Sequence, residues 1–139
     1  MNKENPQESF GVFKPVGHTV IAFATASDLQ HAADALSADG FADTALLRYT
    51  PAEMVAQVDA ELLKVSVLAP FGYELAIVKA HRVQAENGCS FLVVYAPDQD
   101  RADRVAAVAK AHRAVSAQHY GTFMIEELTD LTLGDAPVV

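Results

Sequence analysis

The sequence contains one cysteine and few basic residues, and each shortage narrows what the protein can be. Cys89 has no second cysteine with which to form an intramolecular disulfide, so we expect a buried thiol in a reducing compartment, the cytoplasm. Ten lysines and arginines stand against 18 aspartates and glutamates, which gives a formal net charge of −8 at pH 7. Because an acidic surface repels phosphate backbones, we expect no nucleic-acid partner.

Long hydrophobic runs are missing as well. No apolar stretch approaches the roughly 18 residues that a membrane-spanning helix requires, and residues 1–9 lack the apolar segment of a signal peptide. We therefore expect a cytoplasmic protein with no membrane partner. The 139 residues suit one domain. We place it at 18–128, between an N-terminal arm at 1–17, mobile or docked, and a C-terminal tail at 129–139.

Catalytic motifs are a third absence. The sequence has no glycine-rich nucleotide loop, no G-x-S-x-G elbow and no H-E-x-x-H helix. No basic residue adjoins Cys89 to hold it as a thiolate, and Ser27, Ser37 and Ser116 have no histidine at a recognisable spacing. We therefore predict no catalytic residue, no metal and no cofactor, and we expect the protein not to be an enzyme.

Two strand–helix–strand units that flank a helical insert make up most of the sequence. The units cover Thr19–Thr50 and Cys89–Glu127, and the insert covers 51–87. Ser27 is the expected N-cap of the first helix. The apolar patterns predict strands at 18–24, 44–49, 89–96 and 117–127. The basic side chains of the last helix are expected to face outward: Arg101, Arg104, Lys110 and Arg113.

The first and third predicted strands are the most continuously apolar, which is typical of strands buried on both faces. Placing them in the centre predicts an α+β, ferredoxin-like βαβ-[αα]-βαβ fold with a four-stranded antiparallel sheet in the order 4-1-3-2. Right-handed crossovers put the first and last helices on one face. The insert helices or a second subunit must cover the other face. We expect a homo-oligomer, most simply a dimer.

The insert opens with the clearest local signal in the sequence. Thr50 at the cap, Pro51 at the first helical position and Glu53 at the third form a capping box. A helix is predicted from there to about Val67. After a break at 69–72, a second helix is predicted over Tyr73–Glu86.

The break and the second insert helix also hold candidate contact residues. Phe71 and Tyr73 are placed to anchor a contact between subunits or with a partner, as aromatic residues do at interface centres. Burial of both rings in the core is the alternative. Glu74 and His81 lie seven residues apart, which is too far for direct shared metal ligation. A solvated helix face is the simpler interpretation of that pair.

His119 and Tyr120 are two further ligand candidates, on the last predicted strand. As neighbours on a strand they face opposite sides, so they could serve two layers of the fold. No third polar group is tied to them by spacing. An edge-strand histidine beside a half-buried tyrosine is the structural alternative.

Several runs give the sequence a family resemblance. GHTVIAFATASDLQHAADALSADGF, with YTPAEM, FGYEL, VKAHR and YGTFMIEEL downstream, resembles a set of short, uncharacterised proteobacterial proteins over most of the chain. The opening stretch Val20–Phe41 also looks like bacterial general-stress proteins of the 17M type. Neither resemblance implies a catalytic residue.

Three functions are compatible with these features. The first is a non-enzymatic, self-associating cytosolic domain with an interaction or stress-related role. The second is a small-molecule-binding or enzymatic dimer of the α+β-barrel type, with a ligand between sheet and helices near Tyr73, His119 or Tyr120. The third is RNA binding, because residues 87–95 are similar to the third-strand motif of RNA-recognition-motif domains. Cys89, however, stands where that motif has a stacking aromatic.

Overall fold

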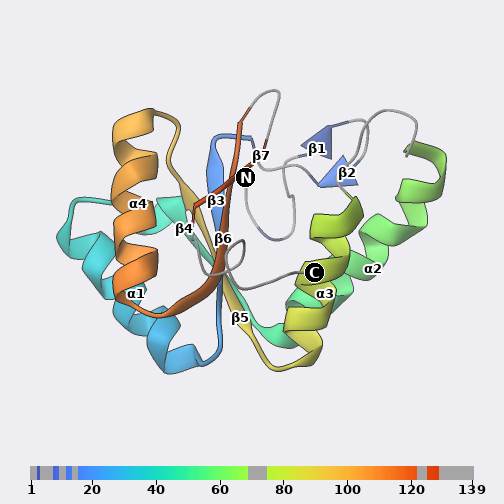
Figure 1. Cartoon of the computed structure of the whole chain (residues 1–139), viewed down its shortest axis with the longest axis horizontal. Helices are drawn as coiled ribbons and strands as arrows, with labels where there is room; N and C mark the ends of the chain where they lie inside the picture. The colour runs from blue at the N-terminus through green and yellow to red at the C-terminus, as the bar shows by residue number, and fades with distance from the viewer. Residues whose placement is uncertain are drawn as a thin grey trace.

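The protein is an α+β fold in which helices cover both faces of one antiparallel sheet (Figure 1). The computed structural model describes residues 3, 8–9, 12–13, 16–68, 75–121 and 125–128, with the backbone alone at 8–9, 12–13, 61–68 and 75. The described helices are α1 (Ala26–Ala38), α2 (Pro51–Leu68), α3 (Leu75–Glu86) and α4 (Gln99–Ala111). The strands of the sheet are β3 (His18–Phe23), β4 (Leu46–Tyr49), β5 (Ser90–Tyr95), β6 (Ala114–Tyr120) and β7 (Ile125–Glu127). Two short strands, β1 (Glu8–Ser9) and β2 (Val12–Phe13), pair separately, and a 3₁₀ turn, Asp43–Ala45, precedes β4.

The sheet is antiparallel, as expected, but it has five strands in the order β4-β5-β3-β6-β7, so the expected four-stranded order is not matched exactly. The difference lies in the last predicted strand, which is not continuous. β6 ends at Tyr120, and β7 folds back to pair with it antiparallel, with Gln118 opposite Glu127 and Tyr120 opposite Ile125. The chain therefore reverses direction between Tyr120 and Ile125.

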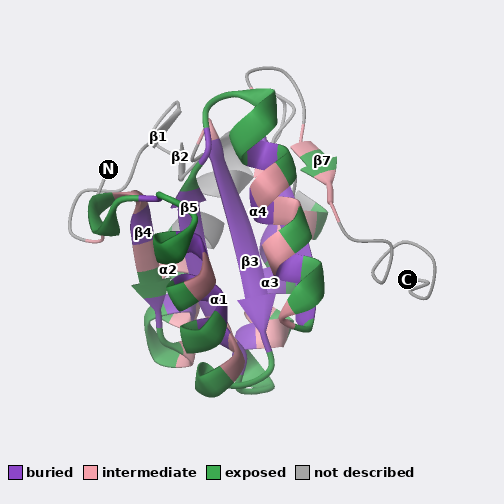
Figure 2. Cartoon of the chain, turned by 90° about the vertical axis from the view of Figure 1, so that its left-hand side faces the viewer, coloured by how far each residue is buried: buried purple, intermediate pink, exposed green. Residues whose placement is uncertain are grey.

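Each face of the sheet has its own apolar core because β3 and β5 present large side chains to both sides. Ile21, Phe23, Leu92 and Val94 pack with α1 and α4. On the other face, β3 and β5 pack with α2 and α3 through a second set of buried side chains, which includes Val20, Phe91, Val93, Met54, Val58 and Val78. Figure 2 shows β3 buried along its whole length. The insert helices therefore cover the face that could otherwise have required a second subunit.

The capping box at the start of the insert is confirmed. The Thr50 hydroxyl accepts a hydrogen bond from the backbone N–H of Glu53 at 3.1 Å, and the Glu53 carboxylate accepts one from the Thr50 N–H at 2.9 Å. The expected cap of α1 is wrong by two residues. Thr25, not Ser27, is the N-cap, and its hydroxyl accepts from the N–H of Asp28 at 3.0 Å.

Replacing Thr50 with alanine is expected to lower the free energy of unfolding by about 1 kcal/mol, because the Glu53 N–H loses its partner. Thr50→Ser keeps the hydroxyl and is the matched control. Urea denaturation of both variants checks the prediction. Equal stability of the alanine and serine variants would mean that the box contributes nothing measurable to α2.

Candidate functional site

Three of the six candidate contact and ligand residues, Phe71, Tyr73 and Glu74, lie outside the described residues. Their roles therefore stay predictions. His81, His119 and Tyr120 are described, and they lie in three different surroundings. The solitary thiol of Cys89 is buried, and burial raises its pKa, which is opposite to what a thiolate nucleophile requires.

His81 is buried rather than on a solvated helix face, so that interpretation is wrong for this residue. Its side chain is 5% exposed on α3, and its ring meets Phe91 edge-on at 5.6 Å. Nε2 lies 2.9 Å from the Oε1 atom of Gln118, which fixes Nε2 as the protonated nitrogen because the amide oxygen can only accept. Burial lowers the pKa of His81, and the ring is neutral at pH 7.

Gln118 extends this contact across the sheet to β7. Its Nε2 atom donates to the two carboxylate oxygens of Glu127 at 3.2 and 3.3 Å. Burial raises the pKa of Glu127. One turn along α3, Gln84 donates to the Ser116 hydroxyl at 2.9 Å. We call these five residues, His81, Gln84, Ser116, Gln118 and Glu127, the polar seam. It joins α3 to β6 and, through Gln118 and Glu127, joins β6 to the edge strand β7.

His119 and Tyr120 point to opposite faces, as their adjacency predicts. The Nδ1 atom of His119 lies 2.9 Å from the hydroxyl of Thr19, on the face that α1 and α4 cover. Burial lowers the pKa of His119, while Glu126 across the strand pair favours its charged form. Tyr120 is buried in the core beneath α2 and α3. The two side chains therefore do not line one ligand space.

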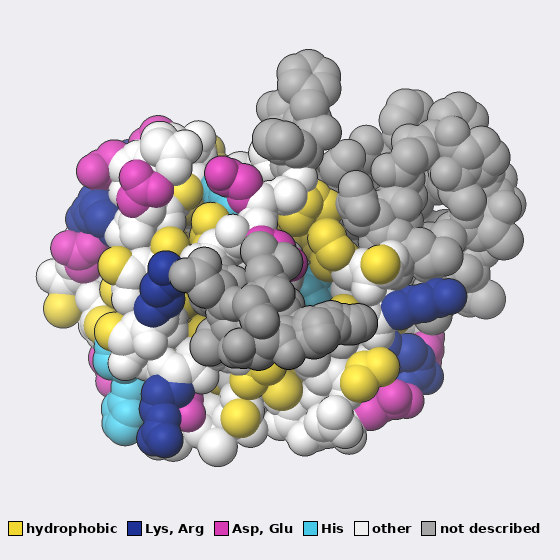
Figure 3. All heavy atoms as spheres, viewed as in Figure 1, with side chains coloured by type: hydrophobic (Ala, Val, Ile, Leu, Met, Phe, Trp, Pro, Cys, Tyr) yellow, Lys and Arg dark blue, Asp and Glu magenta, His cyan; other side chains and the backbone are white. Residues whose placement is uncertain are grey.

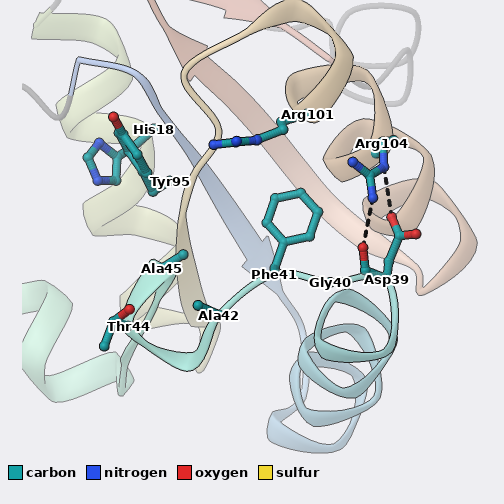
Figure 4. Close-up of a pocket in the computed structure, with 10 residues that line it drawn as sticks. All are labelled: His18, Asp39, Gly40, Phe41, Ala42, Thr44, Ala45, Tyr95, Arg101 and Arg104. Carbon is teal, nitrogen blue, oxygen red and sulfur yellow. Dashed lines mark hydrogen bonds and ion pairs between the residues drawn. The ribbon is translucent and has the colours of Figure 1, made fainter.

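The described structure also has a concave site that the sequence analysis missed. It is an open groove of about 850 Å³ at the end of the sheet where β3 begins and β5 ends. Figure 4 shows its walls, which come from the loop after α1, the end of β5 and the start of α4. The lining residues are His18, Asp39, Gly40, Phe41, Ala42, Thr44, Ala45, Tyr95, Arg101 and Arg104. None of His81, His119 and Tyr120 is among them.

Aromatic side chains form the apolar part of the groove. Tyr95 is 45% exposed, and its ring lies 5.0 Å from the ring of His18 at a tilt of 50°. Gly17 supports this end of the sheet in a left-handed conformation, with a φ of +79°. Its N–H donates to the Tyr120 carbonyl and its own carbonyl accepts from the N–H of Ala96. A Cβ at Gly17 would lie 3.6 Å from the Tyr95 ring, an ordinary contact, so it is the positive φ rather than lack of space that favours glycine here.

The two arginines of α4 have different roles in the groove. Arg104 donates through Nε to the Asp39 carboxylate at 3.0 Å, and through Nη2 to the Asp39 carbonyl at 2.7 Å. Its Nη1 donates to Asp100 at 3.3 Å, and its guanidinium lies 5.4 Å from the centre of the Phe41 ring. Asp39 is the C-cap of α1. Arg104 therefore ties α4 to the end of α1, and the Asp39 contact raises its pKa.

The Arg101 side chain makes fewer contacts with the described residues than the Arg104 side chain does. Its ion pair with Asp98 joins Nε to a carboxylate oxygen at 3.4 Å. Asp98 is the N-cap of α4, where its side chain accepts from the Arg101 N–H at 2.8 Å. From this base the Arg101 side chain extends above Phe41 towards the end of β5, on the other side of which Tyr95 lies (Figure 4).

Charge in the groove differs in sign from that of the chain. Arg101 and Arg104 against Asp39 give the lining a net charge of +1, counting His18 as neutral, in a chain of net charge −8. Over the face seen in Figure 3, the basic side chains of the described residues are dispersed among acidic ones rather than gathered in a stripe. That distribution suits a small anion better than a nucleic-acid backbone.

In the described part of the chain, no three side chains of His, Cys, Asp or Glu are grouped so that they could hold a metal ion. None of the helices, as far as they are described, is both long and apolar enough to cross a membrane.

Comparisons with protein-family models, with curated proteins and with solved structures find no match. The resemblance to short proteobacterial proteins and to general-stress proteins therefore stays an expectation from the sequence.

Proposed function

We propose that the protein is a non-enzymatic binding domain that holds a small molecule in the groove at the end of its sheet. The observation that carries this proposal is a groove of about 850 Å³ that both the Arg101 side chain and the exposed ring of Tyr95 line. Small-molecule sites have volumes of roughly 300–1,000 Å³ and combine apolar walls with a few directed polar groups. We propose a cytoplasmic location, as the sequence predicts.

The groove is built from elements that the rest of the fold holds in place. Arg104 bridges the end of α1 and the start of α4 through Asp39. The sheet end is fixed by the two backbone hydrogen bonds of Gly17. A site with preformed walls spends less of its interaction energy on ordering the protein when a ligand binds.

This location differs from the ligand space of an α+β-barrel, which lies between sheet and helices. We propose that the four longest strands form a ferredoxin-like sheet with β7 as an addition at one edge. Between this sheet and the insert helices the described space is filled by buried side chains, Phe91, Val93 and Met54 among them. A ligand is therefore better accommodated beyond the ends of β3 and β5.

Self-association remains a prediction, but the uncovered apolar face that was the reason for it is not present. The apolar face that called for a second subunit is covered by α2 and α3 of the same chain. Light scattering at several protein concentrations tests it. A constant monomer mass would contradict the dimer and would leave the groove proposal intact.

The binding proposal is tested by screening small-molecule fragments against ¹⁵N-labelled protein by NMR. We expect the fragments that bind to shift the amide signals of 40–45 and 95–104 together, because these segments line the groove. Tyr95→Ala should weaken such binding about tenfold or more, since it removes the exposed ring. Lys110→Gln, at the far end of α4, is the control and should bind as the wild type does. Fragments that bind elsewhere, or none at all, would overturn the proposal.

A further inference from the structure

We infer that the ligand of the groove is a planar aromatic monocarboxylate; this inference rests on the proposed binding function. Three features of the lining support this class of ligand: a guanidinium whose terminal nitrogens extend into the groove, a net charge of +1, and an exposed aromatic ring. Each feature selects a different part of the ligand.

The Arg101 guanidinium favours a ligand with an anionic group of two oxygens. All three nitrogens of Arg104 are used within the protein, on Asp39 and Asp100. Arg101 uses Nε in its 3.4 Å contact with Asp98, and its terminal nitrogens extend into the groove (Figure 4). The planar end of a guanidinium donates two parallel hydrogen bonds, which match the two oxygens of a carboxylate.

The surrounding charge selects a single negative charge rather than several. The lining has a net charge of +1, and the carboxylates of Asp39, Asp98 and Asp100 lie next to the two arginines. A monoanion can be held by Arg101 without competing for Arg104. A phosphate monoester near −2, or a polyphosphate, would bring excess negative charge close to these three carboxylates and be repelled.

The exposed ring face selects a flat apolar body. The Tyr95 ring lies 5.0 Å from the His18 ring, measured between ring centres, with a tilt of 50°, and the residue remains 45% exposed. A large aromatic side chain left this accessible inside a concave site is placed to stack against a planar group. Tyr95 and Arg101 both line the groove, one on each side of the end of β5, so a molecule that spans this strand end can stack on Tyr95 while its carboxylate meets Arg101 (Figure 4).

Four probes of similar size separate these requirements: naphthalene-2-carboxylate, the neutral naphthalene-2-carboxamide, the non-planar decahydronaphthalene-2-carboxylate, and 2-naphthyl phosphate. Affinities are measured by NMR titration of the groove amides at pH 7.5, where the phosphate is a dianion. We expect naphthalene-2-carboxylate to bind at least about tenfold more tightly than each of the other three.

Two variants assign the selectivity to residues. In Arg101→Gln the carboxylate and the carboxamide should bind equally, because the guanidinium is gone, while the carboxamide affinity should stay at its wild-type value. Tyr95→Leu should remove the preference for naphthalene-2-carboxylate over its saturated analogue, and Tyr95→Phe should retain it. Amide spectra of each variant verify that the fold is intact, and Lys110→Gln is the charge-matched control.

The outcomes separate this inference from the proposed function. If the carboxamide, the saturated acid or the phosphate binds the groove as tightly as naphthalene-2-carboxylate, the inference is overturned and the groove remains a binding site of another chemistry. Retention of the carboxylate preference in Arg101→Gln also overturns it. If neither these probes nor any fragment moves the groove signals, the inference and the proposed function fail together.

Discussion

Replacing Phe91 with alanine is expected to lower the free energy of unfolding by about 3–5 kcal/mol, the range for deleting a buried phenylalanine ring. Phe91 is fully buried near the start of β5, and it packs with side chains of both insert helices. The edge of its ring also supports His81. A cavity at this place would therefore separate α2 and α3 from the sheet, and the surrounding side chains can collapse into it only in part.

Tyr95→Ala is the matched control for Phe91→Ala, because it removes a ring of similar size from the same strand. Tyr95 is 45% exposed, so we expect a loss below about 1 kcal/mol. Urea denaturation of both variants measures the two losses. If the two variants were equally stable, the insert helices would not be packed on the sheet through Phe91. That result would favour a second subunit, rather than α2 and α3, as the cover of this face of the sheet.

Much of the fold could be predicted because its signals are local. The box of Thr50 and Glu53 fixed the start of α2 with side-chain hydrogen bonds that need no tertiary partner. The continuous apolarity of 18–24 and 89–96 identified the strands that lie in the interior of the sheet. Which molecule covers the second face is not a local property, so the sequence left it open between the insert and another subunit.

β7 was missed because a chain reversal within a predicted strand gives a weak signal. Residues 117–127 read as one apolar strand, and Gly121 alone does not distinguish a bend from a hairpin. The pairing of β6 with β7 distinguishes the hairpin from a bend. Gln118 lies opposite Glu127, and hydrogen bonds join the side chains of this pair.

The burial of His81 had a signal that could have been read. It lies three residues after Val78 and four before Ala85, on the buried stripe of α3. Its pairing with Glu74 predicted a solvated helix face, whereas the periodicity with Val78 and Ala85 predicts burial. The groove had no such signal, because His18, Phe41, Tyr95 and Arg101 come from four separate segments. Only the strand order brings the ends of those segments together.

His81→Leu is expected to lower the free energy of unfolding by about 1–3 kcal/mol at pH 7.5, because the buried amide oxygen of Gln118 loses its partner. The size of this loss should depend on pH. Burial lowers the folded-state pKa of His81 below its ordinary value of 6.5, so between these two values the unfolded chain binds the extra proton. The stabilisation from the neutral ring is therefore complete above about pH 6.5, and it is lost as the pH falls below that value.

The difference between wild type and His81→Leu should consequently narrow from pH 7.5 to pH 5.5, measured by urea denaturation at each pH. Glu127 has a raised pKa and acts in the opposite direction, losing stability as the pH rises above its ordinary value of 4.5. Both proteins retain Glu127 and its contact with Gln118, so that contribution largely cancels in the difference. His31→Leu, which removes an exposed histidine of α1, is the control and should stay within about 0.5 kcal/mol of wild type. A difference that stays constant over this pH range would show that the buried ring of His81 does not exclude the proton, and the polar seam would then have to be stable with a charged histidine.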